Sequence, residues 1–186
     1  MAAEETIIKT ERLILRPFER GDLEGVAAYY SLPDVRRYLD SKARDRADCK
    51  AALEAMRKQT RLTRPGDTLH LAIVRKSDGV LVGQVSIGWT DATAAQGEIR
   101  FVISTAYRRQ GYATEAVDAA ISLGFDKFHF HRIFARTAGS NQPSARLFKT
   151  LGMRLEAHYR EHALFQGDWD EELHFAILDR EWFGPR

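Results

Sequence analysis

Residues 108–114, with the sequence RRQGYAT, have the composition of an anion-binding turn. They lie between an expected strand at 98–103 and a segment at 113–128 whose apolar residues recur at helical spacing. The first turn of a helix carries unpaired backbone N–H groups and the positive end of the helix dipole. Gly111 lets a ligand approach the backbone, Ala113 leaves room for it, and Arg108 and Arg109 add positive charge. The residues therefore suit a phosphate, although a basic turn exposed to solvent fits them as well.

A second polar pair, Asn141 and Ser144, lies at the expected start of another helix, with Pro143 in its first turn and Gly152 after its end. Residues three apart share one face of a helix. Asn is also a common N-cap residue, whose side chain accepts a hydrogen bond from the first turn. Two interpretations stand: local capping of the helix, or contact of Asn141 with an amide-rich ligand and of the Ser144 hydroxyl with the reacting group.

The elements that must position these residues are predicted from hydrophobic periodicity. Strands are expected at 6–18, 68–75, 80–89, 98–103, 131–137, 153–165 and 168–178. One helix is expected to begin after residue 21 and to end at residue 33. Further helices are expected at 34–39, 45–62, 113–128 and 144–151. A strand meander, a strand–helix–strand–helix unit and a final hairpin follow one another. This order predicts one mixed α/β domain spanning residues 1–186.

Composition narrows the class of protein. The chain has 186 residues, 44% of them hydrophobic and 29% charged, as in an ordinary soluble domain. A net charge of +2 does not favour direct nucleic-acid binding. The single cysteine, Cys49, precludes a disulfide framework, and neither a signal peptide nor a membrane span is evident, so a cytoplasmic protein is expected. The pair His129 and His131 has metal-ligand spacing but no third ligand nearby, so no metal is expected.

Several motifs, in this order, carry a resemblance to a known family. They are EIRF at 98–101, Arg-x-x-Gly-x-Ala at 108–113, Asn-x-x-Ser at 141–144 before LGM at 151–153, and GDWD at 167–170. Together they resemble the GNAT superfamily of acyl-CoA N-acyltransferases. The opening TERLILRPF at 10–18 and the closing DREW at 179–182 resemble its RimJ/RimL-like branch, which includes ribosomal-protein N-terminal acetyltransferases. The resemblance covers residues 10–182.

The resemblance implies a fold and a cofactor site. The expected fold is a mixed, mostly antiparallel central sheet with a splayed parallel strand pair and helices on both faces. The co-substrate is acetyl-CoA, whose pyrophosphate lies in the turn and whose pantetheine arm pairs with the exposed edge of the strand at 98–103. The implied cofactor residues are Arg108, Arg109, Gly111, Tyr112, Ala113 and Thr114 in the turn, Phe101, Val102 and Ile103 on the strand, and Asn141.

The implied reaction is direct attack of a primary amine on the acetyl thioester. Glu98 is the candidate that removes the amine proton, directly or through water, although it is equally suited to pair with Arg100 or a basic group on a neighbouring strand. A backbone N–H near Val102 or Ile103 is the candidate oxyanion donor. Many GNAT enzymes protonate the thiolate with a tyrosine, but Phe148 stands at the corresponding position here. Ser144 is the substitute that we name.

Two acceptors fit this reaction: the N-terminal α-amine of a protein such as a ribosomal protein, or a small amine. The alternative function is a non-catalytic CoA-binding or sensing module, which the departure at Phe148 leaves open. An RNA-associated protein is weakly supported at this net charge. The sequence does not fix whether the acyl group is acetyl or longer. The terminal hairpin is a plausible surface for a homodimer.

Overall fold

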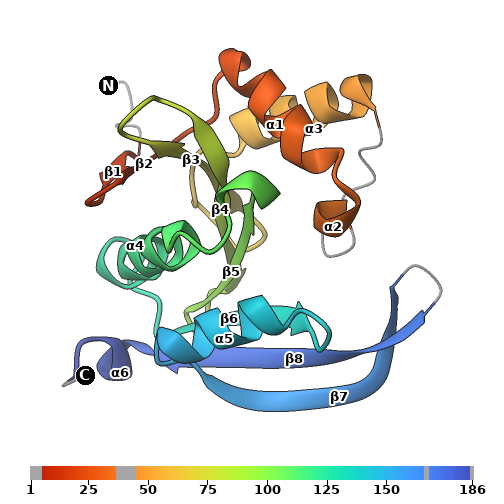
Figure 1. Cartoon of the computed structure of the whole chain (residues 1–186). Helices are drawn as coiled ribbons and strands as arrows, with labels where there is room; N and C mark the ends of the chain where they lie inside the picture. Colours follow the sequence, from red (N-terminus) through yellow and green to blue (C-terminus); the bar gives the residue numbers. More distant parts are fainter. Residues whose placement is uncertain (1–5, 37–44, 166–167, 185–186) are drawn as a thin grey trace.

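The computed structural model describes residues 6–36, 45–165 and 168–184, and they build one twisted sheet with helices on both faces (Figure 1). The strands are β1 (Ile8–Lys9), β2 (Leu13–Arg16), β3 (Thr68–Arg75), β4 (Leu81–Asp91), β5 (Gln96–Ile103), β6 (Arg132–Ala138), β7 (Arg154–Phe165) and β8 (Asp168–Leu178). The helices are α1 (Leu23–Tyr30), α2 (Pro33–Arg36), α3 (Arg46–Lys58), α4 (Tyr112–Asp126), α5 (Gln142–Thr150) and α6 (Asp179–Trp182), with 3-10 turns η1 (Arg20–Asp22) and η2 (Thr105–Tyr107).

Most predicted elements are present within a few residues of their expected bounds, but the strand expected at 6–18 is wrong. That segment forms the hairpin of β1 and β2, in which Ile8 pairs with Leu15. Thr10 closes the turn, because its backbone N–H donates to the Leu13 carbonyl at 3.0 Å and its hydroxyl oxygen accepts from the Leu13 N–H at 3.1 Å. The expected helix at 34–39 begins as α2, and its remainder lies outside the described residues, as does the hairpin turn at 166–167.

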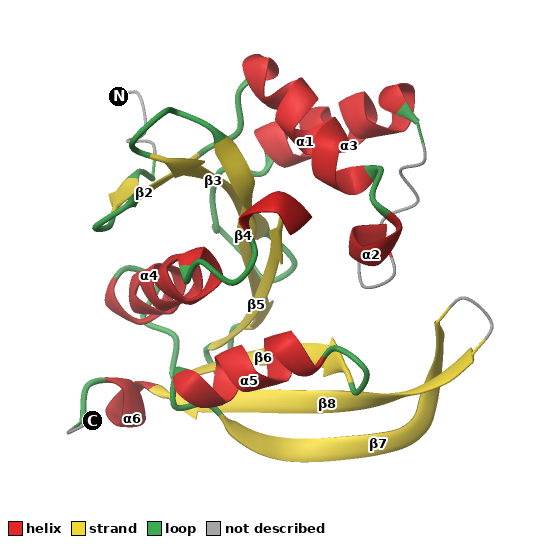
Figure 2. Cartoon of the chain, in the orientation of Figure 1, coloured by secondary structure: helices red, strands yellow, loops and turns green. Residues whose placement is uncertain are grey.

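The strand order is β1-β2-β3-β4-β5-β6-β8-β7, and every neighbouring pair is antiparallel except β5 and β6. The parallel pairing joins only Gln96–Glu98 to Arg132–Phe134. Beyond Glu98 the two strands diverge, and Figure 2 shows β5 rising away from the half of the sheet that contains β6 and β8. The mixed sheet with a splayed parallel pair is therefore confirmed.

Helices α4 and α5 cover one face of the sheet. Alternate residues of the strands, such as Ile73 and Ile99, are buried against α4. The side of α4 that faces them carries Ala116 and Ala120, both fully buried, and these small side chains let the helix lie close to the strands. This packing therefore holds α4 close against the sheet.

The opposite face is covered by α1 and α3 over the β2–β4 half of the sheet. Tyr29 and Leu53 pack there against Ala72. The Tyr29 hydroxyl donates to the side-chain oxygen of Gln84 at 2.9 Å, which satisfies a polar group inside this second core. Within the described part of the chain, no helix is long and apolar enough to cross a membrane.

Candidate active site

The diverging end of β5 presents backbone groups that β4 does not use. The Ser104 N–H donates to the Val82 carbonyl of the neighbouring chain segment at 2.9 Å. Because the N–H and C=O groups of alternate residues in an antiparallel strand point to the same neighbour, Val102 also faces β4, where it pairs with Gln84. Phe101 and Ile103 consequently direct their backbone groups to the side that β6 has left. Of the three predicted edge residues, the register turns the backbone groups of Phe101 and Ile103 away from β4, but not those of Val102. Their pairing with a ligand arm stays a prediction.

The turn that follows β5 leads directly into the N-terminus of α4. Gly111 is the N-cap residue, with a left-handed φ of 82°, and no side chain caps the helix. The first intrahelical bond runs from the Glu115 N–H to the Gly111 carbonyl at 3.1 Å. The N–H groups of Tyr112, Ala113 and Thr114 therefore have no partner within the helix. These are the groups that the sequence predicted for a phosphate.

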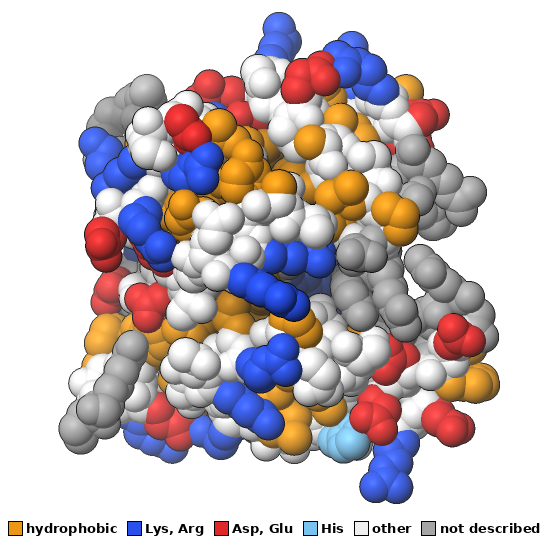
Figure 3. Space-filling view, in the orientation of Figure 1, with side chains coloured by type: hydrophobic (Ala, Val, Ile, Leu, Met, Phe, Trp, Pro, Cys, Tyr) orange, Lys and Arg blue, Asp and Glu red, His pale blue; other side chains and the backbone are white. Residues whose placement is uncertain are grey.

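Basic side chains surround this helix terminus. Arg108 and Arg109 are exposed, and the left-handed φ of 60° at Arg109 helps to reverse the chain. Figure 3 shows that Lys and Arg side chains gather on this face of the molecule, over α5 and beside the N-terminal end of α4. Free N–H groups, the helix dipole and guanidinium charge all favour an anion at this position.

Asn141 and Ser144 form the N-cap of α5. The Asn141 Oδ1 atom accepts a hydrogen bond from the Ser144 N–H at 3.4 Å, which is the capping arrangement that the sequence allowed. Both side chains remain partly accessible. Their contact with a cofactor arm stays a prediction.

Phe148, on the same helix, is 2% exposed and lies beside the free edge of β5. Its ring makes an edge-to-face contact with Phe101, with 5.8 Å between ring centroids, and a tilted contact with Phe175 at 5.5 Å. The position expected to hold a tyrosine is thus next to the diverging strand, but its side chain has no proton to donate.

Glu98 lies where the pairing of β5 and β6 ends, and two arginines hold it. Its carboxylate accepts from Arg136 Nε at 2.9 Å and from Arg100 Nη2 at 3.1 Å. Burial raises the pKa of Glu98, but the bonds from Arg136 and Arg100 outweigh burial, and the pKa lies below its ordinary value. This is the pairing that the sequence allowed as the alternative to a base. Arg136 is the basic group on a neighbouring strand that this alternative allowed, and the sequence could not name it because the register of β6 was unknown.

A half-buried histidine, His70, lies in the same row of cross-strand neighbours as Arg100. His70 on β3 pairs with Ser86 on β4, which in turn pairs with Arg100 on β5. Burial, and to a smaller extent the charge of Arg100, lower the pKa of His70 to about 4. His70 is therefore neutral at physiological pH and contributes no charge beside Glu98.

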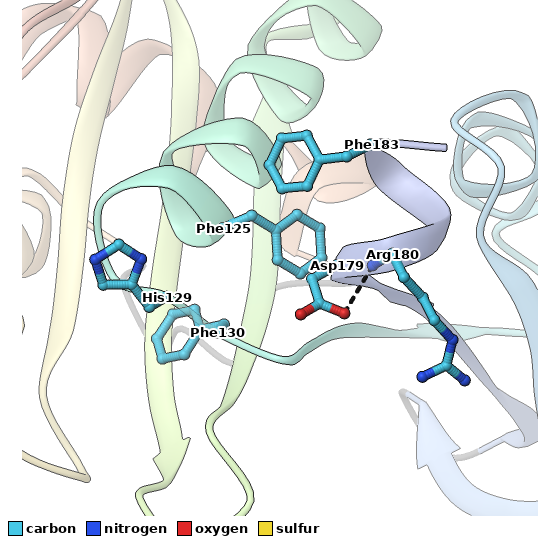
Figure 4. Close-up of a pocket in the computed structure, with 6 residues that line it drawn as sticks. All are labelled: Phe125, His129, Phe130, Asp179, Arg180 and Phe183. Atoms are coloured by element: carbon cyan, nitrogen blue, oxygen red, sulfur yellow. Dashed lines mark hydrogen bonds between the residues drawn. The ribbon is translucent and has the colours of Figure 1, made fainter. Parts of the chain in front are cut away.

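A separate pocket of about 350 Å³ lies at the opposite end of α4 (Figure 4). Phe125, Phe130 and Phe183 line it together with His129, and the Asp179 carboxylate accepts from the Arg180 N–H at 2.7 Å. Because this pocket lies by the C-terminal end of α4, far along the helix from Gly111, we do not assign it to the cofactor. Among the described residues, no cluster of His, Cys, Asp or Glu is arranged to hold a metal ion.

Comparison with known proteins places the chain in a family. The model of the acetyltransferase (GNAT) domain matches residues 12–154, and the chain belongs to that family. It is 30% identical over 176 residues to YnaD of Bacillus subtilis (strain 168), an uncharacterized N-acetyltransferase, with 94% of this chain and 98% of the relative covered. The crystal structure of a GNAT-family acetyltransferase from Bacillus anthracis superposes with a TM-score of 0.82 at 28% identity, covering 94% of this chain and 99% of the other.

The relatives also include the ribosomal protein uS5-alanine N-acetyltransferase of Escherichia coli (strain K12). It is 22% identical over 187 residues, with 94% of this chain and 92% of that protein covered. The expected resemblance to the GNAT superfamily and its ribosomal-protein acetyltransferases is thereby confirmed, and the chain is an N-acetyltransferase.

Proposed function

We propose that this enzyme transfers an acetyl group from acetyl-CoA to a primary amine by direct attack of the amine on the thioester. The observation that carries the proposal is one continuous run of chain. The outward-facing backbone groups of Phe101 and Ile103 are followed, within one short turn, by the unpaired N–H groups at the start of α4. A ligand with an amide-bearing arm and a pyrophosphate matches both features. The pyrophosphate would lie at Gly111–Thr114 and the pantetheine arm along β5, with Asn141 beside it.

The polar group at the base of the diverging strands suits an amine that must lose a proton. Glu98, Arg100 and Arg136 together carry more positive than negative charge. Nearby positive charge lowers the pKa of an amine and favours its reactive neutral form. Glu98 would accept the proton through water, since its own carboxylate is occupied by guanidinium groups. The Ile103 N–H, facing the cofactor side, would stabilise the developing oxyanion.

The thiolate leaving group needs a second donor. Phe148 cannot supply a proton, so we assign stabilisation of the thiolate to a hydrogen bond donated by the hydroxyl of Ser144, on the partly accessible first turn of α5, with solvent supplying the proton that the thiolate finally takes up. If Ser144 does not act, the thiolate leaves without this hydrogen bond. The tests of Ser144 and Glu98 are given in the Discussion.

The acceptor that we favour is the N-terminal α-amine of a protein, because the relatives of this chain include a ribosomal-protein alanine N-acetyltransferase. A small amine is the other candidate acceptor. A non-catalytic CoA-binding module is the alternative function, since the usual tyrosine is replaced by Phe148. Cytoplasmic location and a homodimer remain predictions from the sequence.

A screen for CoA release tests the proposal. Purified protein is incubated with acetyl-CoA and with peptides that differ in their N-terminal residue, alongside a panel of small amines. Each peptide is matched by a copy whose N-terminus is already acetylated. We expect time-dependent release of CoA thiol with a subset of free-amine peptides and none with their blocked copies.

Three other outcomes would change this conclusion. Activity on small amines alone would contradict acetylation of protein N-termini. Binding of CoA without release in the presence of any acceptor would support the sensing module. Absence of CoA binding would contradict the proposed function itself.

A further inference from the structure

The carboxylate of Glu115, in the first turn of α4, is held by a distant part of the chain. Thr10 Oγ1 donates to its Oε1 atom at 2.6 Å, and the Arg12 backbone N–H donates to the same atom at 2.7 Å. Arg12 Nε donates to the other oxygen, Oε2, at 2.7 Å. Thr10 and Arg12 belong to the turn of the β1–β2 hairpin, about one hundred positions earlier in the sequence. The Glu115 side chain is only 15% exposed, so these contacts hold the hairpin turn firmly on the helix.

Arg12 also reaches across the turn that precedes the helix. Its Nη1 atom donates to the Gln110 carbonyl at 2.9 Å, and its guanidinium lies over the Tyr112 ring, 4.9 Å from the centroid. A Cβ atom at Gly111 would lie 3.0 Å from Arg12 Nη2. One side chain thus contacts Gln110 and Tyr112 and lies beside Gly111 between them, at the proposed pyrophosphate site.

The contact with Gln110 determines where the next N–H points. A peptide unit is planar, and in a trans unit the carbonyl of one residue and the N–H of the next point in opposite directions. The described chain contains no cis peptide bond. Because Arg12 fixes the Gln110 carbonyl on its own side, the Gly111 N–H points away from Arg12. Gly111 has no Cβ and adopts φ of 82°, so without this contact its peptide unit would rotate easily.

The pairing of Arg12 with Glu115 also compensates the negative charge at the start of α4. A carboxylate in the first turn stabilises the helix dipole, but an unpaired one would repel a phosphate. Burial raises the pKa of Glu115, whereas the bonds from Thr10 and Arg12 lower it, and the pKa lies below its ordinary value. Glu115 is therefore ionised and neutralised by Arg12, which leaves the N–H groups of the turn available to an anion.

We propose that Arg12 and Glu115 are positioning residues of the cofactor site. Glu115 fixes Arg12, and Arg12 fixes the 110–111 peptide unit so that the Gly111 N–H is presented to the pyrophosphate. The proposal rests on the proposed function, because it assigns the donors of the same acetyl-CoA site. It gives the opening Thr-x-Arg segment a role in cofactor binding rather than in the sheet alone.

Calorimetric titration of CoA into the full-length protein tests the proposal. Arg12→Lys keeps the charge but loses the guanidinium fork, and Glu115→Gln keeps the shape but loses the charge. Each is expected to weaken CoA binding about tenfold. Glu54→Gln, which disrupts an arginine pair on α3, is the matched control and should bind CoA as the wild type does. The Arg12→Lys/Glu115→Gln double variant should bind no more weakly than the worse single variant, because the two residues act as one unit.

Comparing two acyl donors separates a role in pyrophosphate binding from a purely structural role. With an acceptor found in the screen, the variants should lose about tenfold in kcat/KM for acetyl-CoA but less than twofold for acetyl-pantetheine, which has no pyrophosphate. Equal losses with both donors, single-variant CoA affinities within twofold of the wild type, or additive losses in the double variant would each overturn the proposal while leaving the proposed function intact. Failure of the wild type to bind CoA would instead remove the proposed function.

Discussion

Glu98 is paired with Arg136 and Arg100, and this pairing limits how it can act. A carboxylate whose pKa is lowered is a weaker base, and one that is held by two guanidinium groups must weaken those bonds to accept a proton. Acting through a water removes the need for direct contact with the amine, but the proton still ends on Glu98 and weakens its bonds to the two guanidinium groups. The same pairing gives Glu98 a structural role, because it joins β5 to β6 at the last paired position before they diverge.

The structural role predicts a pH-dependent loss of stability in Glu98→Gln. Since the folded-state pKa of Glu98 is lower than its unfolded value, its stabilisation is full above the unfolded pKa and is lost as the pH falls through the folded pKa. We expect the variant to have a free energy of unfolding about 1–2 kcal/mol lower at pH 7, and this difference to shrink on acidification. Urea unfolding at several pH values measures it. A difference that is constant with pH would mean that the ionised carboxylate is not what stabilises the strands.

The pH profile of kcat/KM in the same variant tests Glu98 as the base. If Glu98 accepts the proton, the acidic limb of the profile should change in Glu98→Gln. An acidic limb that matches the wild type would place the base elsewhere.

Among the elements, the helices that border the diverging strands were predicted well from sequence. The periodicity of α4 and the Asn-x-x-Ser start of α5 are local signals, and both helices begin close to where they were expected. The break between β1 and β2 was not predicted, because it depends on Thr10, whose hydroxyl contacts both the Leu13 backbone and the distant Glu115. Contacts of that range leave no periodic pattern in the sequence.

Helix α5 offers Ser144 as the donor to the leaving thiolate, since Phe148 has no hydroxyl. Ser144→Ala is expected to lower kcat by about tenfold or more while CoA affinity changes less than threefold. Steady-state kinetics measure kcat, and calorimetric titration measures the affinity for CoA. Thr150→Ala is the control, because the hydroxyl of Thr150 donates to the Arg146 carbonyl within the same helix. Unchanged turnover in Ser144→Ala would show that the thiolate leaves without help from this hydroxyl.

At the level of the molecule, the site exists because two halves of one sheet diverge. Helices α4 and α5 on one face and α1 and α3 on the other keep each half packed (Figure 1). β5 can therefore end with backbone groups that neither β4 nor β6 pairs with, one of which, the Ile103 carbonyl, accepts from Arg108 Nε at 3.5 Å. The sheet class and helix positions followed from strand and helix patterns, whereas the divergence itself was expected only from the resemblance to the family. Residue patterns report burial within one element, but they do not report the register at which two strands stop pairing.

The affinity of CoA for Gly111 variants tests most directly whether the diverging strand and the start of α4 form the cofactor site. Gly111→Glu places a carboxylate in front of the unpaired N–H groups, whereas Gly111→Ala adds the strain of a Cβ at a left-handed φ of 82° and a close contact of that Cβ with Arg12 Nη2 at 3.0 Å. Gly66→Glu, at a left-handed glycine with φ of 95° and open space around it, controls for the charge and the strain. By calorimetric titration we predict about a hundredfold loss of CoA affinity for Gly111→Glu, a loss of less than tenfold for Gly111→Ala, and wild-type affinity for Gly66→Glu. A Gly111→Glu variant that folds and binds CoA as tightly as the wild type would contradict the assignment of this turn as the pyrophosphate site.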